Sequence, residues 1–389
     1  MQEPSKEAER VPELDGLRAV AIALVIGCHY KAFAASLDRL PEFGWFGVEI
    51  FFVLSGYLIT TNLLALRGRP GAYRVFYSRR IRRIFPPYFL ILAACTLVFA
   101  AFTARFNTQL ILLQSGFLTA FVRSGTVLSS AVLAFRTHSC PPLLQRSSLL
   151  PLSPPGVELR TLHDALGATW SLSVEEWFYI LWAPVVLAFG RKGIAAASVP
   201  AFVAGFVLRW INGTKGLVWY EDFFCRFDLL ALGALLAIWL GFRNGAKISI
   251  QRQGDRIVGI LGVLGLTGLT AMLLYIQPIV GREIRDSSLF AAFGTICVGL
   301  ISTCVISFLV LKTRGLSPFK WILRSKPLVW IGRRSYMIYL AHLPWYWIVC
   351  AMLGTTTRSS WTSAILSLVL TLATAALSWE YIERPLLRT

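Results

Sequence analysis

A cation and an imidazole, Arg18 and His29, lie eleven positions apart in the apolar segment LDGLRAVAIALVIGCHY. In an α-helix, eleven steps of 100° make three turns plus about 20°, so both side chains project from one face, roughly 16 Å apart along the axis. A cation and an imidazole are costly to bury in a membrane helix and therefore mark a functional site. A neutral imidazole in such surroundings is the usual general base for a hydroxyl. The alternative is a structural histidine, bonded to a backbone carbonyl or a buried acid.

A second candidate is the run YSRRIRRIFPPYF, which contains Arg79, Arg80, Arg82 and Arg83. Runs of this kind commonly mark the cytoplasmic side of a membrane span. Guanidinium groups also match phosphate oxygens in a bidentate geometry. If a helix begins near Ser78, Arg80 and Arg83 lie three residues apart and converge on one ligand. We therefore expect these two arginines to bind a phosphate-bearing molecule.

The third candidate is the glutamate pair in TWSLSVEEWFYILW, Glu175 and Glu176, at the outer start of a predicted crossing. Acids in the first turn of a helix interact favourably with the positive end of its dipole, and this role accounts for one of the two. We expect one glutamate to reach inward from the side opposite the arginines, where it orients His29 or binds the hydroxyls of an acceptor.

Five further polar residues are candidates for supporting roles. Tyr339 and His342 share a helix face with Tyr336 at three-residue spacing. An ion pair between Arg226 and its near neighbour Asp228 is the structural alternative for that acid. The seven cysteines contain no C-x-x-C pair, so no metal site is expected. The full set of supporting residues is Asp15, Glu49, Asp228, Tyr339 and His342.

Helices through a lipid bilayer are the elements that must position these residues. The chain has 389 residues, 56% hydrophobic and 15% charged, whereas soluble domains are nearer 25% charged. Apolar runs of about 20 residues recur, each long enough to cross ~30 Å of hydrocarbon. The net charge of +18 comes from Lys and Arg beside these runs, which favours a membrane protein over a nucleic-acid binder. We predict an all-α, polytopic transmembrane bundle that forms a single domain over residues 1–389.

Ten crossings are predicted, with both termini in the cytoplasm because this places most Lys and Arg inside. The first is a retained helix rather than a cleaved signal peptide, since no small-residue cleavage pattern follows it. Residues 105–135 either cross once, which inverts everything downstream, or form a re-entrant or interfacial segment, which keeps the charge bias and is favoured. Residues 136–168 form a Pro/Ser-rich external loop. The crossings are 17–34, 44–64, 84–104, 171–189, 194–212, 226–242, 257–277, 288–311, 329–352 and 361–381.

These segments, in this order, resemble the acyltransferase-3 family of integral-membrane O-acyltransferases. The matches span residues 13–385, and although each is weak alone, seven in family order are a strong signal. They are ELDGLRAVAIALVIGCHY, GVEIFFVLSGYLIT, the R-x-x-R-I-x-P pattern from Arg80 to Pro86, TWSLSVEEWFYILW, RFDLLALGALLA, IGRRSYMIYLAHLP and YIERP.

The resemblance implies transfer of an acyl group, commonly acetyl, from cytoplasmic acyl-CoA to a hydroxyl. The acceptor would be an envelope glycan, a glycolipid or a natural product, and the location the cytoplasmic (inner) membrane. No bound cofactor is expected, since acyl-CoA is a co-substrate. Carried over position by position, the family's site residues fall on Arg18 and His29 in the first helix, on Arg80 and Arg83, and on Glu175 and Glu176.

Two expectations concern the overall organisation. Many members of the family carry a C-terminal SGNH-type esterase domain, whereas this sequence stops after its last helix. We expect any acceptor handling of that kind to be absent or to be supplied by a separate extracytoplasmic partner. The expected mechanism has acyl-CoA phosphates held by the arginines, the acyl arm rising along the first helix, and His29 acting about half way through the bilayer. The alternatives are a proton-coupled transporter or a flippase of envelope precursors.

Overall fold

The computed structural model describes residues 11–30, 32, 44–103, 108–119, 165–213, 218–243, 245, 247–276, 287–311, 317–355 and 360–388. Within these ranges the regular structure is helical, without strands, which confirms the predicted all-α class. The predicted external loop 136–168 lies almost wholly outside the described residues, as do residues 120–135.

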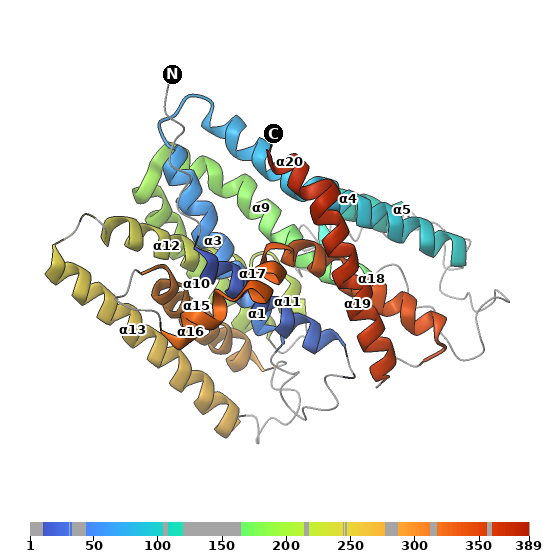
Figure 1. Ribbon diagram of the computed structural model, residues 1–389. Helices are drawn as coiled ribbons and strands as arrows, with labels where there is room; N and C mark the ends of the chain where they lie inside the picture. The colour runs from blue at the N-terminus through green and yellow to red at the C-terminus, as the bar shows by residue number, and fades with distance from the viewer. Residues whose placement is uncertain are drawn as a thin grey trace.

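The longer helices form a bundle in which the C-terminal helices lie across α4 (Figure 1). Their bounds are α1 Pro12–His29, α3 Phe46–Leu66, α4 Ala72–Thr103, α5 Thr108–Ser115, α9 Trp170–Pro184, α10 Gly190–Asn212, α12 Phe227–Arg243, α13 Ile248–Ala271, α15 Thr295–Val310, α18 Ser335–Met352, α19 Trp361–Ser378 and α20 Arg384–Arg388. Short elements are η3 Gly167–Thr169, η4 Val185–Phe189, α11 Val218–Glu221, η5 Met272–Ile276, η7 Phe290–Gly294, α16 Pro318–Leu323, α17 Lys326–Arg333 and η8 Trp379–Glu383.

Six helical stretches among the described residues are long and apolar enough to cross a membrane. A helical membrane bundle is therefore the fold, while the count of ten crossings stays a prediction. One of the six, Gly167–Asn212, holds two predicted crossings, α9 and α10, which meet at Gly190. That glycine has φ of +60°, a conformation that residues with a Cβ rarely adopt.

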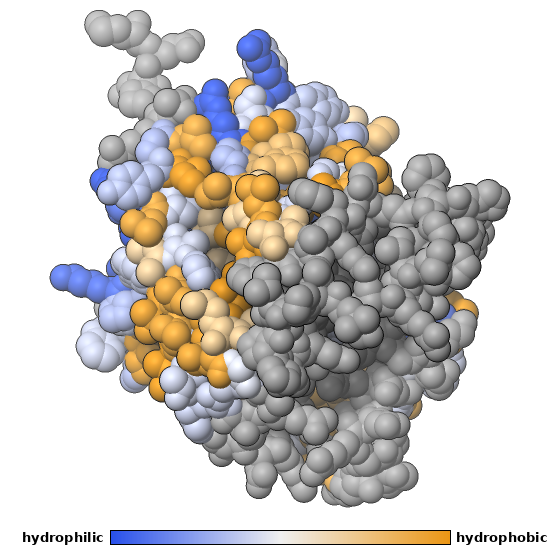
Figure 2. All heavy atoms as spheres, turned by 90° about the vertical axis from the view of Figure 1, so that its right-hand side faces the viewer, coloured by the Kyte–Doolittle hydropathy of each residue, from blue (hydrophilic) through white to orange (hydrophobic). Residues whose placement is uncertain are grey.

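The outer surface of the bundle is apolar, as a lipid-facing surface must be. Large hydrophobic side chains are exposed along α10, α13 and α19, including Val203 at 58%, Val263 at 61% and Val369 at 55%. On the face turned toward the viewer in Figure 2, hydrophobic residues cover much of the coloured area, and strongly hydrophilic ones lie at its upper and left edges. This distribution agrees with a band of hydrocarbon around the helices.

Three predicted boundaries were wrong. Helix α1 ends at His29 instead of continuing to residue 34, so the imidazole lies at a helix end. Helix α4 begins at Ala72 instead of near Ser78, so the whole arginine run is inside the helix. The predicted crossing 329–352 is divided at Arg334 into α17 and α18.

The described part of the ambiguous stretch 105–135 forms α5, whose eight residues span about 12 Å, too short to cross a bilayer. It ends in a turn in which Phe117 has φ of +52°. The Phe117 carbonyl accepts hydrogen bonds from Ser173 and from the Trp177 indole at 3.0 Å. This segment therefore docks on α9, beside the glutamate pair.

Helix α3 packs tightly on its neighbours through glycines. A Cβ on Gly56 would lie 1.9 Å from the Leu230 carbonyl oxygen of α12, and one on Gly233 would lie 2.0 Å from the Val53 oxygen. A Cβ on Gly47 would meet the Ala21 oxygen of α1 at 2.2 Å. The backbones of α1, α3 and α12 therefore approach each other as small residues allow in membranes.

We expect Gly56→Ala to lower the free energy of unfolding by about 1–3 kcal/mol, because the added methyl forces α3 and α12 apart. The matched control is Gly259→Ala on α13, where a Cβ meets nothing within 4 Å. That variant should be neutral or stabilising by up to about 1 kcal/mol. Denaturant unfolding in detergent micelles measures both, and equal effects would refute tight packing at the α3–α12 contact.

Candidate active site

Polar side chains from four helices meet in a group that we call the arginine–glutamate cluster. The Glu175 carboxylate of α9 accepts hydrogen bonds from Ser55 of α3 at 2.9 Å and from the Tyr179 hydroxyl at 2.7 Å. The Arg80 guanidinium of α4 lies over the Tyr179 ring, 5.5 Å from its centroid. The cluster consists of Arg18, Ser55, Arg80, Glu175, Glu176 and Tyr179.

The two glutamates of this cluster lie close to its arginines, so opposite charges face each other. The Glu175 carboxylate is close enough to Arg80 and Arg18 to attract both guanidinium groups electrostatically. The Glu176 carboxylate attracts Arg80 in the same way. Both glutamates belong to the second turn of α9, which begins at Trp170, so they are not in the capping turn. The prediction that they act from the side opposite the arginines was wrong, because interhelical register places them beside those arginines.

The arginine run of α4 has two sides. Arg79 and Arg82 are exposed, whereas Arg80 and Arg83 are partly buried, which confirms that the latter two share the inward face. Arg80 contacts the Phe76 ring at 5.8 Å as well as Tyr179. Arg83 lies within Coulomb range of Glu383 near the C-terminus. Two cations separated by one turn are thus held beside acids and rings.

Arg18 is oriented by a carboxylate of its own helix, Asp15. Its guanidinium donates to Asp15 at 3.1 Å, and Asp15 also faces Arg333 of α17 at 3.6 Å. The Asp15 side chain is 4% exposed, but Arg18 keeps 19% of its surface accessible. Asp15 therefore orients Arg18 while leaving part of the guanidinium open to a ligand.

His29 is paired with a second imidazole that comes from the far end of the chain. The His29 Nδ1 atom lies 2.9 Å from the Val25 carbonyl oxygen and 3.3 Å from Nε2 of His342 on α18. The two ring centroids are 5.1 Å apart. Nδ1 of His342 is 2.6 Å from the Tyr339 carbonyl oxygen. The structure places His342 beside the His29 ring, so the prediction that a glutamate orients His29 was wrong.

Helix α18 runs from the arginine–glutamate cluster to this histidine pair. Tyr336 lies within Coulomb range of Glu175 and Glu176 and donates to the Ile84 carbonyl of α4 at 3.0 Å. Tyr339 contacts the Ser171 hydroxyl at 2.6 Å and donates to the Ala168 carbonyl at 2.8 Å. His342 follows six residues after Tyr336, about 9 Å along the axis. The predicted shared face thus extends from the arginine–glutamate cluster to the histidine pair.

The family model of an acyltransferase domain, Acyl_transf_3, matches residues 11–380. The chain belongs to the acyltransferase-3 family. The match covers nearly the whole sequence, so both the arginine–glutamate cluster and the histidine pair lie within the acyltransferase domain.

Curated relatives of this acyltransferase domain are named as O-acetyltransferases, two of them with peptidoglycan in the name. It is 28% identical to the peptidoglycan O-acetyltransferase OatA of Listeria monocytogenes and 27% identical to the putative peptidoglycan O-acetyltransferase YrhL of Bacillus subtilis. It is also 28% identical to the O-acetyltransferase OatA of Staphylococcus aureus. Each alignment covers 97% of this chain but 55–57% of the relative, so the chain spans just over half their length. No solved structure matches it.

Two predicted supporting acids belong to buried ion pairs instead of the site. Asp228 pairs with Arg209 of α10, with its two oxygens at 3.0 and 2.6 Å from the guanidinium. Glu49 of α3 pairs with Arg226. All four side chains are fully buried. The structural alternative for Asp228, an ion pair, is observed, but its partner is Arg209 of α10 and not its near neighbour Arg226, which pairs with Glu49 of α3.

Arg209 was not among the predicted functional residues. The available signal was a lone arginine within an apolar helix, which implies a buried acidic partner. Together the two pairs connect α3, α10 and α12. Arg226 also lies over the Tyr220 ring at 4.2 Å, and Tyr220 lies within Coulomb range of Tyr339. The two ion pairs therefore stabilise the packing of these three helices.

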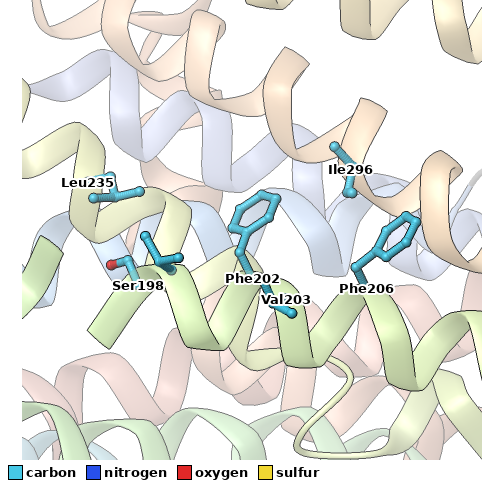
Figure 3. Close-up of a pocket in the computed structure, with 7 residues that line it drawn as sticks. Ser198, Phe202, Val203, Phe206, Leu235 and Ile296 are labelled. Atoms are coloured by element: carbon cyan, nitrogen blue, oxygen red, sulfur yellow. The ribbon is translucent and has the colours of Figure 1, made fainter. Parts of the chain in front are cut away.

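Other parts of the described structure offer no comparable chemistry. An apolar depression between α10, α12 and α15 is lined by Phe202, Phe206, Leu235 and Ile296 (Figure 3). Its one hydroxyl, Ser198, donates to the Ile194 carbonyl at 2.7 Å. Among the described residues, no group of three or more His, Cys, Asp or Glu could hold a metal ion.

We expect Asp228→Asn to lower the free energy of unfolding by about 3–5 kcal/mol, because it leaves Arg209 buried without a counter-charge. The double variant Arg209→Met, Asp228→Leu should recover most of that loss. The exposed pair Arg384–Glu380, with both side chains 47% exposed, is the control. Arg384→Ala should cost less than about 1 kcal/mol, and a buried-pair variant no worse than this one would contradict a structural role.

Proposed function

We propose that this acyltransferase domain is an acyl-CoA-dependent O-acyltransferase of the cytoplasmic membrane that transfers acetyl groups to hydroxyls of an envelope glycan. The observation that carries the proposal is the arrangement of cations and imidazoles around α1. Arg18 and His29, eleven residues apart on that helix, each keep part of their surface accessible, whereas Asp15 beside Arg18 and His342 beside His29 are buried. The relatives named as peptidoglycan O-acetyltransferases support the choice of acceptor.

The donor would bind through its phosphates. We expect Arg18 of α1 and Arg80 and Arg83 of α4 to converge on one ligand, because guanidinium groups bind phosphate oxygens in pairs. Glu175 and Glu176 balance this positive charge before the ligand arrives and keep the guanidinium groups oriented. The thioester would then reach along α1 and α18 to the histidine pair.

The acyl transfer itself would use His29. Its imidazole removes the proton from the acceptor hydroxyl as the oxygen attacks the thioester carbonyl carbon, and the carbon–sulfur bond breaks as the ester forms. The departing CoA thiolate takes the proton back from the imidazolium. General base catalysis of this kind contributes about 10²–10⁴-fold. Fixing both reactants inside an apolar bundle lowers the barrier further by several kcal/mol.

We expect His29→Ala to lower the rate of acetyl transfer by about 10²–10⁴-fold without a change in unfolding midpoint. The measurement uses purified protein in nanodiscs, radiolabelled acetyl-CoA and soluble peptidoglycan fragments as acceptor. Near wild-type transfer by this variant would refute His29 as the base. Glycan uptake by wild-type protein in liposomes, with no acetyl-CoA turnover, would instead indicate a transporter or flippase.

We expect Arg80→Gln to raise the KM for acetyl-CoA about 10- to 100-fold with a small change in kcat, because one charge-assisted contact with phosphate is lost. Arg79→Gln, on the exposed side of the same helix, is the matched control and should leave KM unchanged. Equal effects of the two substitutions would show that the run acts through membrane topology alone.

A further inference from the structure

We propose that His342 is a positioning residue that holds His29 in the tautomer with a proton on Nδ1, so that Nε2 of His29 is the reacting nitrogen. The inference rests on the proposed function for its catalytic meaning, but the tautomer follows from contacts alone. It deepens that function by assigning the reacting atom and a side chain that, together with the Val25 carbonyl, selects it.

The protonation of both rings follows from their carbonyl partners. A backbone carbonyl accepts hydrogen bonds and cannot donate them. Nδ1 of His29 therefore carries a proton toward the Val25 oxygen at 2.9 Å, and Nδ1 of His342 carries one toward the Tyr339 oxygen at 2.6 Å. In neutral His342 the lone pair is then on Nε2, which faces His29 Nδ1 at 3.3 Å.

The His29 proton is thus shared between two acceptors, Val25 and His342. Moving it to Nε2 would turn the Nδ1 lone pair toward the Val25 oxygen and the His342 Nε2 lone pair, so both hydrogen bonds would be replaced by repulsion. The second tautomer of His29 is therefore disfavoured. The lone pair on Nε2 is left for the acceptor hydroxyl, as an oriented imidazole requires.

Surrounding contacts keep His342 in place. Its side chain is fully buried, and its own backbone carbonyl accepts a hydrogen bond from the Tyr30 hydroxyl at 3.0 Å. Tyr30, the residue after His29, is fully buried and stacks on Tyr346 of α18 with ring centroids 4.6 Å apart. Tyr30 therefore holds the end of α1 against the middle of α18, next to the imidazole contact.

A neutral acceptor suits this environment better than a carboxylate. When Nε2 of His29 takes the substrate proton, the ring becomes a cation that keeps donating from Nδ1 to Val25 and His342. These two partners stabilise the positive charge through their dipoles. A carboxylate at the same place would be an additional buried charge, which is costly to desolvate.

The test compares two substitutions that differ in one property. His342→Phe keeps a ring of similar size but removes the acceptor, and it should lower kcat about 10²-fold with the KM for acetyl-CoA within about threefold. His342→Gln provides an amide oxygen near the position of Nε2 and should restore most of the loss. Equal kcat for the two variants, or a change confined to KM, would overturn the proposal.

A second measurement determines the tautomer of His29 directly and does not depend on catalytic activity. The nitrogen chemical shifts of ¹⁵N-histidine-labelled protein distinguish protonated from unprotonated ring nitrogens, and a His138→Asn, His163→Asn background leaves His29 and His342 alone to assign. We expect His29 protonated at Nδ1 in the wild type, and a mixture of tautomers in His342→Phe. A wild-type proton on Nε2 would overturn the proposal. A wild type with the expected tautomer but without acetyl transfer would instead refute the proposed function.

Discussion

The site depends on one constraint, that a charged or imidazole group inside an apolar bundle must find its partner on another helix or on its own backbone. Each polar residue of α1 illustrates this. Asp15 lies between Arg18 and Arg333 of α17, and His29 lies between Val25 and His342 of α18. Contacts with other helices therefore fix the positions of the polar side chains of α1. Any change in the packing of those helices would move these side chains.

Burial separates the charged groups that hold the bundle together from those that are available to a ligand. Arg209, Asp228, Glu49 and Arg226 are fully buried and paired, so they fasten α3, α10 and α12. Arg18, with 19% of its side chain accessible, belongs to the second group, and Glu175 and Arg80 are also partly exposed. Removing a fully buried partner should affect stability first, whereas removing a partly exposed one should affect binding or catalysis first.

Helix periodicity and residue chemistry predicted the parts of the site that belong to a single helix. Arg18 and His29 on one face of α1, and Arg80 and Arg83 on the inward face of α4, are of this kind. The errors concern pairs between helices. The ion-pair partner considered for Asp228 was its near neighbour Arg226, and the glutamates were placed opposite the arginines, because one sequence contains no information on how α10 is registered against α12, or α9 against α4. The His29–His342 contact was missed for the same reason, although both residues were candidates.

The central claim is that the arginines of α1 and α4 and the histidine pair belong to one binding site for acyl-CoA. A CoA thioester with a photoreactive diazirine in its acyl group tests this in nanodiscs, with the labelled residues located by mass spectrometry. The account predicts labelling at the end of α1 and in the middle of α18, around His29 and His342, with loss of labelling in the presence of excess acetyl-CoA and in Arg80→Gln. Labelling elsewhere in the bundle, or labelling of this region that Arg80→Gln leaves unchanged, would contradict it.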